Sequence, residues 1–365
     1  MCIYPKLLKV NFNPLIIKMM EYKRFSQIDL NDPFFDSLKA DYAEFKDWYL
    51  KKSVNNEEAY VVETNTGIQG FLYLKVEDDE INDVKPPLPK VKRVKVGTLK
   101  VNPHGTRLGE RFVKKIFDYA TINDVEEIYV TVFEKHTALI RVFEKYGFIN
   151  HGVKTTGNGS EIVMLRKLKS LKNSITESFP LIKLEGREKY LLSIHPPFHS
   201  RLFPDSLLNN EDYDIIQDIS YTNSIHKIYI CYMDVSILKT GDQIVIYRTS
   251  DTPGAAFYRS VATSICTVEE VKMKGSFANV DDYVNYCRDY SIFDEAELRE
   301  FYKKPNLFVI KMTYNAAFAK RLTRGQLITD VGLDADAYWG FMRLTNGQFI
   351  DILNRGKVSE GIIIN

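Results

Sequence analysis

Residues 99–120 carry the sequence feature that most limits how this chain can fold. The stretch "LKVNPHGTRLGERFVKKIFDYA" begins as a β-like segment, passes through a turn containing Pro and Gly, and continues with apolar residues at helical spacing. The first turn of a helix here would present unsatisfied backbone N–H groups and the positive end of the helix dipole, which together favour a phosphate. The sequence therefore predicts a strand–turn–helix unit of an α/β fold, whose turn either binds a phosphate or only connects the two elements.

Strand and helix patterns alternate on both sides of this unit, from about residue 20 to residue 168. Residues 33–52 have aromatic side chains at spacings of three and four, which predicts one or two amphipathic helices, and a hairpin follows with its turn at Asn65-Thr66-Gly67. The later elements are predicted at residues 93–101 (strand), 107–121 (helix), 126–133 (strand), 136–147 (helix) and 160–168 (strand). This order predicts one α/β domain over residues 1–168.

The pattern changes after residue 168. The stretch "KLKSLKNSITES" is polar, basic and poor in bulky apolar residues, so residues 169–188 are expected to be a linker. Short β-rich runs such as "KIYICYM" and "QIVIYRT" follow, with helical segments between them. Residues 189–365 are therefore predicted to form a second domain, a small β-barrel or curled sheet with packed helices. A length of 365 residues accommodates two domains of ordinary size.

Composition argues against several classes of protein. Lys and Arg total 49 against 48 Asp and Glu, so the formal net charge is +1 and no overall field draws the chain to nucleic acid or to an acidic membrane. The four cysteines are scattered without paired spacing, which argues against a disulfide framework and a zinc module and fits a reducing, cytoplasmic setting. These cysteines are Cys2, Cys231, Cys266 and Cys287.

Targeting and metal-binding signals are not recognisable in the sequence. The first twenty residues mix Pro, Asn and Lys with apolar residues, so they lack the continuous core of a signal peptide, and no later run reaches the length of a membrane span. Met20 is an alternative start. His195 and His199 have a spacing found in metal sites, but two prolines between them argue against a regular helix and no acidic or cysteine cluster completes a ligand set. We expect no metal and no membrane partner.

The helix predicted from residue 136 ends in "FEKYGF", Phe143 to Phe148. Together with the strand–turn–helix unit and the order of elements over residues 20–168, this stretch resembles the GNAT family of acetyl-coenzyme A (acetyl-CoA) dependent N-acetyltransferases. Members of that family carry a glycine-containing pyrophosphate loop and a "YEKxGF"-like signature. The resemblance implies a mixed-sheet α/β fold and acetyl-CoA as cosubstrate, with pantetheine along a strand and pyrophosphate at the following turn. The residues it implies for cofactor binding are Leu99, Lys100, Val101, Thr106, Arg107, Leu108, Gly109, Glu110, Arg111 and Phe143.

Two positions depart from the family pattern. Aligned with the family's loop motif, the chain keeps only the last glycine, Gly109, and has Arg107 at the first. The Arg107 guanidinium is expected to reach a phosphate, with a loop narrowed by its bulk as the alternative. Many members carry a general-acid tyrosine where this chain has Phe143, which has no proton to give to the departing thiolate. Tyr146, three residues further on, is the candidate for that role, with a place in the core as the alternative reading.

The resemblance also implies direct attack of a substrate amine on the thioester, and the amine must be neutral when it attacks. The predicted strand 93–101 holds no Asp or Glu, so Glu134 and His136, just after the next strand, are the nearest candidates for a base or for orienting the substrate. A lysine amine with a pKa of about 10.4 is ~0.1% neutral near pH 7.4, whereas an α-amine with a pKa of about 7.8 is roughly 30% neutral. An α-amine is therefore the favoured acceptor.

The second half carries a resemblance of its own. The predicted strand "LLSIHPP", the Gly241-Asp242 turn and the strand "TSICTVEEV" resemble the ASCH/PUA-like fold, whose small β-barrels often bind RNA or modified nucleotides, although the Gly-x-Lys-x-x-Glu-x-Arg signature of many ASCH members is absent. Nucleic-acid recognition needs cations for phosphates and flat side chains for bases. The residues expected to serve it are Tyr247, Arg248, Tyr258, Arg259 and Arg321.

These observations favour an acetyl-CoA dependent N-acetyltransferase whose second domain selects an RNA-linked or nucleotide-like acceptor. Aminoacyl-tRNA combines an α-amine with a phosphate-rich body, and its acetylation would block translation, as in toxins that resemble the first domain. One alternative is a protein N-acetyltransferase. Another is a non-enzymatic RNA- or nucleotide-binding protein that keeps a degenerate acetyltransferase domain as a scaffold. The sequence leaves the oligomeric state open, with a dimer among the alternatives.

Overall fold

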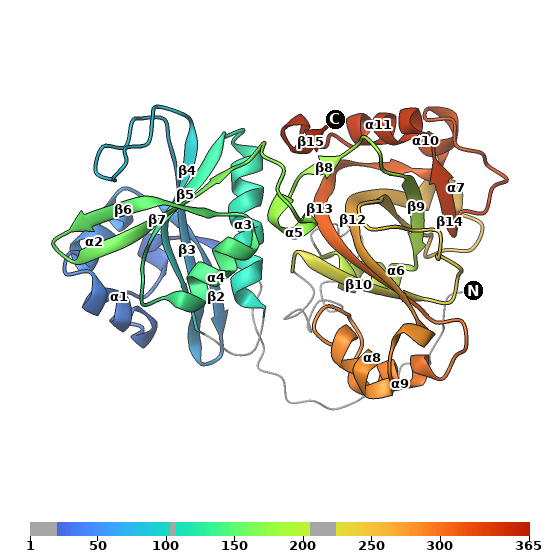
Figure 1. The fold of residues 1–365 in the computed structure, drawn as a ribbon, viewed down its shortest axis with the longest axis horizontal. Helices are drawn as coiled ribbons and strands as arrows, with labels where there is room; N and C mark the ends of the chain where they lie inside the picture. Colours follow the sequence, from blue (N-terminus) through green and yellow to red (C-terminus); the bar gives the residue numbers. More distant parts are fainter. Residues whose placement is uncertain (1–19, 103–106, 205–223) are drawn as a thin grey trace. The chain divides into compact units, whose positions relative to one another are not determined.

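Figure 1 shows the computed structural model of the chain, which describes residues 20–102, 107–204 and 224–365. The chain divides into two compact units, and the division falls between Lys172 and Asn173. Residues 20–172 are called the first unit below, and residues 173–365 the second unit. The alternative start at Met20 concerns residues 1–19, which lie outside the described residues.

A seven-stranded mixed sheet forms the first unit (Figure 1). Its strand order is β1-β2-β3-β4-β5-β7-β6, and within the described residues every neighbouring pair is antiparallel except β4 and β5, which run parallel. The strands are β1 (Glu21–Arg24), β2 (Glu58–Thr64), β3 (Gly67–Glu77), β4 (Arg93–Val101), β5 (Glu127–Phe133), β6 (Ile149–Thr156) and β7 (Gly159–Lys167). The mixed-sheet α/β fold expected from the sequence is confirmed.

Helices cover both faces of this sheet. Successive residues of a strand point to opposite faces. On β3, Phe71 packs in an aromatic cluster with Phe35 and Tyr49, whereas Gly70 lies so close to α3 that a Cβ would meet the Phe112 ring at 2.4 Å. The helices are α1 (Asp36–Asp41), α2 (Phe45–Val54), α3 (Leu108–Ile122) and α4 (Thr137–Lys145), with the 3₁₀ turns η1 (Phe25–Gln27) and η2 (Pro33–Phe35).

A six-stranded sheet and a separate two-stranded ladder form the second unit. The sheet has the order β10-β13-β12-β11-β9-β14, and β8 pairs with β15. The edge strands β10 and β14 do not pair with each other in the described residues, so of the two expected forms, barrel or curled sheet, the sheet is open there. Three register shifts along the β12–β13 pair let these long strands bend. The strands are β8 (Ile182–Lys183), β9 (Lys189–Ile194), β10 (His226–Cys231), β11 (Gln243–Arg248), β12 (Val261–Met273), β13 (Phe308–Thr323), β14 (Phe341–Leu344) and β15 (Ile363–Ile364).

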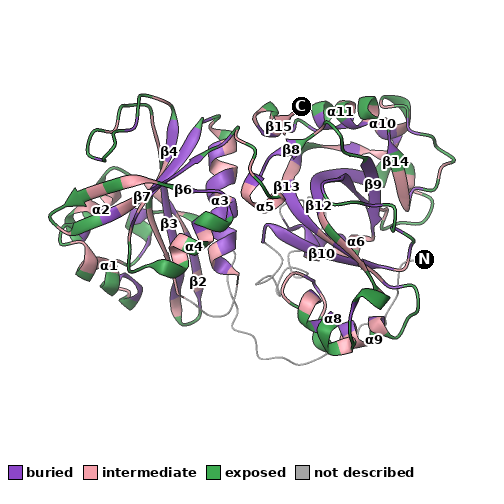
Figure 2. Ribbon diagram, viewed as in Figure 1, coloured by how far each residue is buried: buried purple, intermediate pink, exposed green. Residues whose placement is uncertain are grey.

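Apolar clusters cover both faces of the six-stranded sheet. Along β9, Leu192 belongs to one cluster and Leu191 to the other, as the alternation of a strand requires. Figure 2 shows β9 and β10 as buried strands. Every residue of β11 is buried as well. The helices are α5 (Ile175–Ser178), α6 (Pro196–Leu202), α7 (Ala256–Arg259), α8 (Val280–Cys287), α9 (Glu295–Tyr302), α10 (Arg324–Thr329) and α11 (Asn346–Arg355), with η5 (Lys274–Ser276) and η6 (Glu360–Ile362).

Part of the segment expected to be a linker is folded into the second unit. Residues 173–188 belong to that unit, β8 pairs with β15, and Ile182 is fully buried. The polar run at 169–178 precedes a short apolar segment, residues 179–182, which is buried throughout. In this division the second unit begins at residue 173, ahead of the start expected at residue 189.

Candidate active site

The parallel strands β4 and β5 separate halfway along their length. They pair from Arg93↔Glu127 to Val96↔Val130, and within the described residues no pairing between them continues beyond that point. β4 still pairs with β3 as far as Val101, and β5 still pairs with β7 as far as Phe133. The sheet therefore opens between residues 97–101 and 131–133, where backbone groups along both strand edges are available to a ligand.

Gly97 marks the point at which the opening begins. The register between β3 and β4 shifts at Tyr73/Leu74, so that Gly97 is the extra residue of a β-bulge. A Cβ on Gly97 would meet the Tyr73 ring at 2.7 Å, so a larger residue would displace that ring. The bulge bends β4 away from β5 at the residue where their pairing ends.

Leu99, Lys100 and Val101, which are expected to hold pantetheine, form the β4 side of the opening. All three are half-buried. The Lys100 side chain turns toward the α1 side of the sheet, where its Nζ donates to Ser37 Oγ at 2.6 Å and to the carbonyl of Phe34, and burial lowers the pKa of this amine. At Lys100 the backbone is therefore the part that can face a ligand in the opening.

Helix α3 begins just after the turn that follows β4. Its N-cap residue, Arg107, makes no side-chain capping hydrogen bond, and Leu108 is buried. A Cβ on Gly109 would meet no atom within 4 Å, and the residue does not have the left-handed backbone that favours glycine. Glycine at the second helical position lowers helix stability relative to alanine. A glycine there does, however, leave the space that a phosphate needs to approach the backbone at the helix start. Thr106, the remaining loop residue expected to bind the cofactor, lies outside the described residues.

Glu110 and Arg111, in the first turn of α3, are turned inward. The Glu110 carboxylate lies 2.5 Å from Lys145 Nζ of α4 and 3.6 Å from the Arg107 guanidinium, and it is 8% exposed. Arg111 is also buried. The Glu110 carboxylate ties α3 to α4 and would repel a phosphate, so the expected role of Glu110 in cofactor binding falls to its backbone N–H and stays a prediction.

Phe143 and Tyr146, at the end of α4, both lie in the core with 0% exposure. The Phe143 ring packs on Phe148 with a centroid separation of 4.9 Å. The candidate role of Tyr146 as general acid stays a prediction. The alternative reading, a core tyrosine, describes its position.

Glu134 and His136, the expected base candidates, lie on the exposed connection between β5 and α4. His136 Nε2 lies 3.5 Å from Asp41 Oδ2, and Lys135 forms an ion pair with the same carboxylate. His136 is the N-cap residue of α4, but its side chain makes no capping hydrogen bond. These contacts join the β5–α4 connection to the end of α1.

A buried carboxylate that sequence reasoning missed lies on the same side of the sheet. Glu161, on β7, is 4% exposed, and its Oε1 accepts a hydrogen bond of 2.7 Å from the Tyr42 hydroxyl. The Tyr42 ring also packs on Phe133, the last residue of β5, at 5.3 Å between centroids. Burial and the negative charge of Glu161 both raise the pKa of the Tyr42 phenol, so this hydroxyl stays protonated as a donor.

A second polar cluster lies below the opening, where β4 and β5 still pair. The Tyr129 hydroxyl donates to Glu77 Oε2 at 2.6 Å, and Lys95 Nζ lies 4.0 Å from the other oxygen of Glu77. Burial lowers the pKa of Lys95. For Glu77, burial acts to raise the pKa, but the Tyr129 hydrogen bond and the nearby lysines outweigh it, and the pKa is lowered. These groups therefore satisfy one another.

In the second unit, the residues expected to bind RNA separate into two sets. Tyr247 and Arg248 are each only 2% exposed, so the expectation that they form a recognition surface is wrong. Every residue of β11 is buried, and the Tyr247 ring packs on Trp339 at 5.2 Å. Arg321 is half-buried. Tyr258, by contrast, is 78% exposed on α7, and Arg259 next to it is exposed and paired with Asp251 at 2.7 Å and 2.8 Å.

His199 belongs to the same buried region as Arg248. The expectation that the two prolines prevent a helix is wrong: Pro196 and Pro197 begin α6, where a missing N–H costs nothing, and His199 lies inside it. His199 is fully buried, and its Nε2 lies 2.8 Å from Thr263 Oγ1. Burial, followed by the charges of Arg248 and Arg321, lowers the His199 pKa to about 3, so the imidazole is neutral. Within the described ranges, no three His, Cys, Asp or Glu side chains gather as a metal site.

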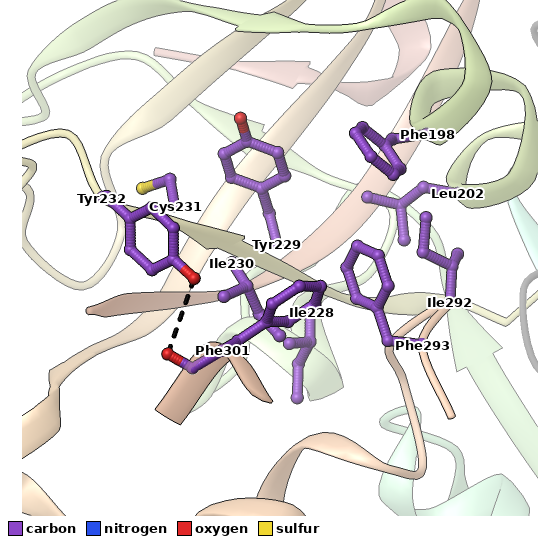
Figure 3. A pocket seen from close by; sticks show the side chains of 10 residues that line it. All are labelled: Phe198, Leu202, Ile228, Tyr229, Ile230, Cys231, Tyr232, Ile292, Phe293 and Phe301. Atoms are coloured by element: carbon purple, nitrogen blue, oxygen red, sulfur yellow. Dashed lines mark hydrogen bonds between the residues drawn. The ribbon is translucent and has the colours of Figure 1, made fainter. Parts of the chain in front are cut away.

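A cavity beside β10 is unsuited to a phosphate or an ammonium group. Figure 3 shows aromatic and aliphatic side chains around it, with the Tyr232 hydroxyl directed at the carbonyl of Phe301. None of its lining residues is charged. They are Phe198, Leu202, Ile228, Tyr229, Ile230, Cys231, Tyr232, Ile292, Phe293 and Phe301.

In the first unit, the opening between two parallel strands lies next to the start of a helix whose N-cap side chain makes no capping hydrogen bond. Residues 22–148 match the model of the acetyltransferase (GNAT) family. The first unit therefore contains a GNAT domain, which supports an acetyl-CoA dependent N-acetyltransferase.

Solved structures similar to parts of this chain include members of two groups. The ASCH protein of Zymomonas mobilis is 8% identical, with a TM-score of 0.32, over 46% of this chain and 94% of that protein. A GNAT-family acetyltransferase of Bacillus cereus is 18% identical, with a TM-score of 0.28, over 42% of this chain and 100% of its own. The NatC complex bound to Gag peptide and CoA is 18% identical, with a TM-score of 0.29, over 41% of this chain and 98% of that chain.

No curated protein sequence matches the chain. In the described part of the chain, helices fall short of the length and apolar character needed to cross a membrane.

Proposed function

We propose that the protein transfers the acetyl group of acetyl-CoA to the α-amine of an RNA-linked or nucleotide-like acceptor, in particular aminoacyl-tRNA, and that the second unit selects this acceptor. The observation that carries the proposal is the opening between β4 and β5 at Val96↔Val130, next to the start of α3. A thioester held there would be reachable by an amine from the α1 side of the sheet.

The chain's own residues supply a site for acetyl-CoA. The backbone from Leu99 to Val101, along the edge of β4 that is not paired with β5, would hydrogen-bond pantetheine. The N–H groups at the start of α3 would bind the pyrophosphate, with Gly109 leaving room for it and Arg107 adding charge. Acetyl-CoA supplies an activated acetyl group and a thiolate as leaving group.

The acceptor is proposed to be an α-amine because little help with deprotonation is visible on β4. No Asp or Glu occurs among residues 93–101. Near pH 7.4 the neutral fraction of an α-amine exceeds that of a lysine amine by about two and a half orders of magnitude. An aminoacyl ester on tRNA presents such an amine.

Selection of an RNA-linked acceptor is proposed for the exposed aromatic and basic side chains around α7. Phe257 and Tyr258 are both exposed, and their rings pack at 4.9 Å between centroids. Arg259 is exposed on the same helix, and Arg324 at the start of α10 lies over the Trp339 ring at 4.5 Å. Flat side chains beside guanidinium groups are suited to stacked bases and phosphates.

The test is to incubate the full chain with labelled acetyl-CoA and either a pool of aminoacylated tRNA or a pool of peptides with free N-termini. Label in RNA that mild alkaline deacylation removes is the expected result. Label confined to peptides would contradict the RNA-linked acceptor and favour a protein N-acetyltransferase. Absence of label in both, with RNA binding intact, would contradict the transferase and favour a binding protein.

A further inference from the structure

Glu161 is a buried carboxylate that lacks a matching cation. It is 4% exposed, its hydrogen-bond partner is the Tyr42 hydroxyl, and within the described residues it forms no ion pair. Burying an unpaired charge is costly, so such a group is usually paired or hydrogen-bonded by something else. A cationic group from a ligand would complete the arrangement.

The charged neighbours of Glu161 are committed to other partners. Lys154, which faces Glu161 across the β6–β7 ladder, forms an ion pair with Asp83 at 2.6 Å. Lys135 and His136, on the β5–α4 connection, both lie against Asp41. The remaining carboxylate from the α1–α2 connection, Glu44, accepts from Asn158 Nδ2 at 2.9 Å and 2.8 Å.

Glu161 lies one strand away from the opening between β4 and β5. Its register partner on β5 is Phe133, and the other edge of β5 at residues 131–133 borders the opening. Neighbouring strands are about 4.8 Å apart, so an amine in the opening is within reach of the Glu161 carboxylate directly or through one water. Tyr42 packs on Phe133 and holds Glu161 by its hydroxyl, so the three side chains form one wall on the α1 side of the sheet.

We infer that Glu161 receives the acceptor's ammonium group and removes its proton, with Tyr42 as the residue that positions the carboxylate. This inference rests on the proposed function and names the base that β4 lacks. The ammonium gives a proton to Glu161, and the amine nitrogen then bonds to the acetyl carbonyl carbon. The carbon–sulfur bond breaks, the thiolate takes up the second proton lost by nitrogen, and Glu161 releases the first proton to solvent.

The experiment compares wild type with Glu161→Gln across pH 6 to 9, using acetyl-CoA and an amide-linked 3′-aminoacyl adenosine, which is stable where an aminoacyl ester hydrolyses. At pH 6.5 we expect kcat/KM of Glu161→Gln to be lower by roughly 100-fold. Without the base, the rate depends on amine that is already neutral, so the deficit should shrink about tenfold per pH unit up to the amine pKa near 7.8. Acetyl-CoA affinity measured by calorimetry should be unchanged.

Two variants separate a base from a structural residue. Tyr42→Phe keeps the ring on Phe133 but removes the hydrogen bond, and we expect a three- to tenfold loss with a similar pH trend. Glu127→Gln removes a buried carboxylate paired with Arg93, away from the opening, and should lower the melting temperature without changing the shape of the pH profile.

A Glu161→Gln deficit that is absent, or that is the same at every pH, would overturn the inference. The same profiles are measured on a tripeptide with a free N-terminus. If wild type acetylates the tripeptide and not the aminoacyl adenosine, the proposed acceptor fails while the Glu161 comparison still stands on the tripeptide data.

Discussion

The strands of the two units differ in how completely they are paired and covered. β9, β10 and β11 of the second unit are buried at every residue, whereas β4 of the first unit is buried at its start and half-buried from Thr98 to Val101. The half-buried end of β4 is the part that does not pair with β5. The first unit therefore offers backbone to a ligand within its sheet, and the second unit can offer mainly the side chains of its loops and short helices.

The largest effect on stability is expected where β4 still pairs with β5. Arg93 and Glu127 form a buried ion pair of 2.9 Å there, with 0% and 7% exposure. Arg93→Ala leaves a buried carboxylate without its cation and should lower the free energy of unfolding by about 3–5 kcal/mol. The measurement is unfolding in urea followed by Trp48 fluorescence. In a Trp339→Phe background this signal reports on the first unit alone.

Arg141→Ala, on the exposed face of α4, is the matched control for this prediction, because removing an exposed arginine should change stability by less than about 0.5 kcal/mol. Equal effects of the two substitutions would mean that the paired end of β4 is not a stability-determining part of the unit.

The stability of the second unit should depend on pH, because its core buries a histidine. The His199 pKa is lowered to about 3 in the folded chain. In the unfolded chain the imidazole has its usual pKa of about 6.5, so below that pH unfolding is accompanied by uptake of a proton. Stability from this group is present above about pH 6.5 and falls by up to about 1.4 kcal/mol per pH unit as the pH drops toward 3.

The measurement is urea unfolding at Trp339 in a Trp48→Phe background, at pH 7.5 and pH 5. Between these values His199→Gln should lose about 2 kcal/mol less stability than the protein that keeps His199. The same loss in both proteins would show that His199 is not kept neutral by the fold.

A smaller effect, on binding alone, is expected at the exposed aromatic residues of the second unit. Tyr258→Ala should weaken binding of a single-stranded RNA by roughly tenfold, because one stacked base contributes about 1–3 kcal/mol, and should leave the melting temperature unchanged. Fluorescence anisotropy with a labelled oligonucleotide measures it. Tyr22→Ala, another exposed tyrosine but on β1, is the control, and an equal loss there would remove α7 as the recognition surface.

Much of the first unit follows from sequence because its central elements have strong periodicity. The predicted strand at 93–101 has the bounds of β4, and the predicted helices at 107–121 and 136–147 contain most of α3 and α4. The strand β6 was missed, since it is an edge strand whose residues are exposed or half-buried throughout and so show no apolar alternation.

The side-chain contacts of the site could not be predicted from the sequence, because they join residues that are far apart along the chain. Glu161 and Tyr42 are 119 residues apart, and His199 and Thr263 are 64 residues apart, so no local pattern links them. Tyr247 and Arg248 have the composition of a recognition surface, but a strand covered on both faces buries them. Gly109 is the exception, because its functional reading came from the sequence and its surroundings in the structure leave the space that reading needs.

The most direct test of the account is calorimetric titration of acetyl-CoA into wild type, Gly109→Ala and Gly347→Ala. Gly109 and Gly347 are each the second residue of a helix, α3 and α11, and a Cβ on either meets no atom within 4 Å. Both variants should be as stable as wild type or more stable, by up to about 1 kcal/mol.

We expect micromolar binding to wild type and Gly347→Ala, and at least tenfold weaker binding to Gly109→Ala. Equal binding by all three proteins would mean that the start of α3 does not hold the pyrophosphate. No binding to wild type would contradict the acetyl-CoA site as a whole.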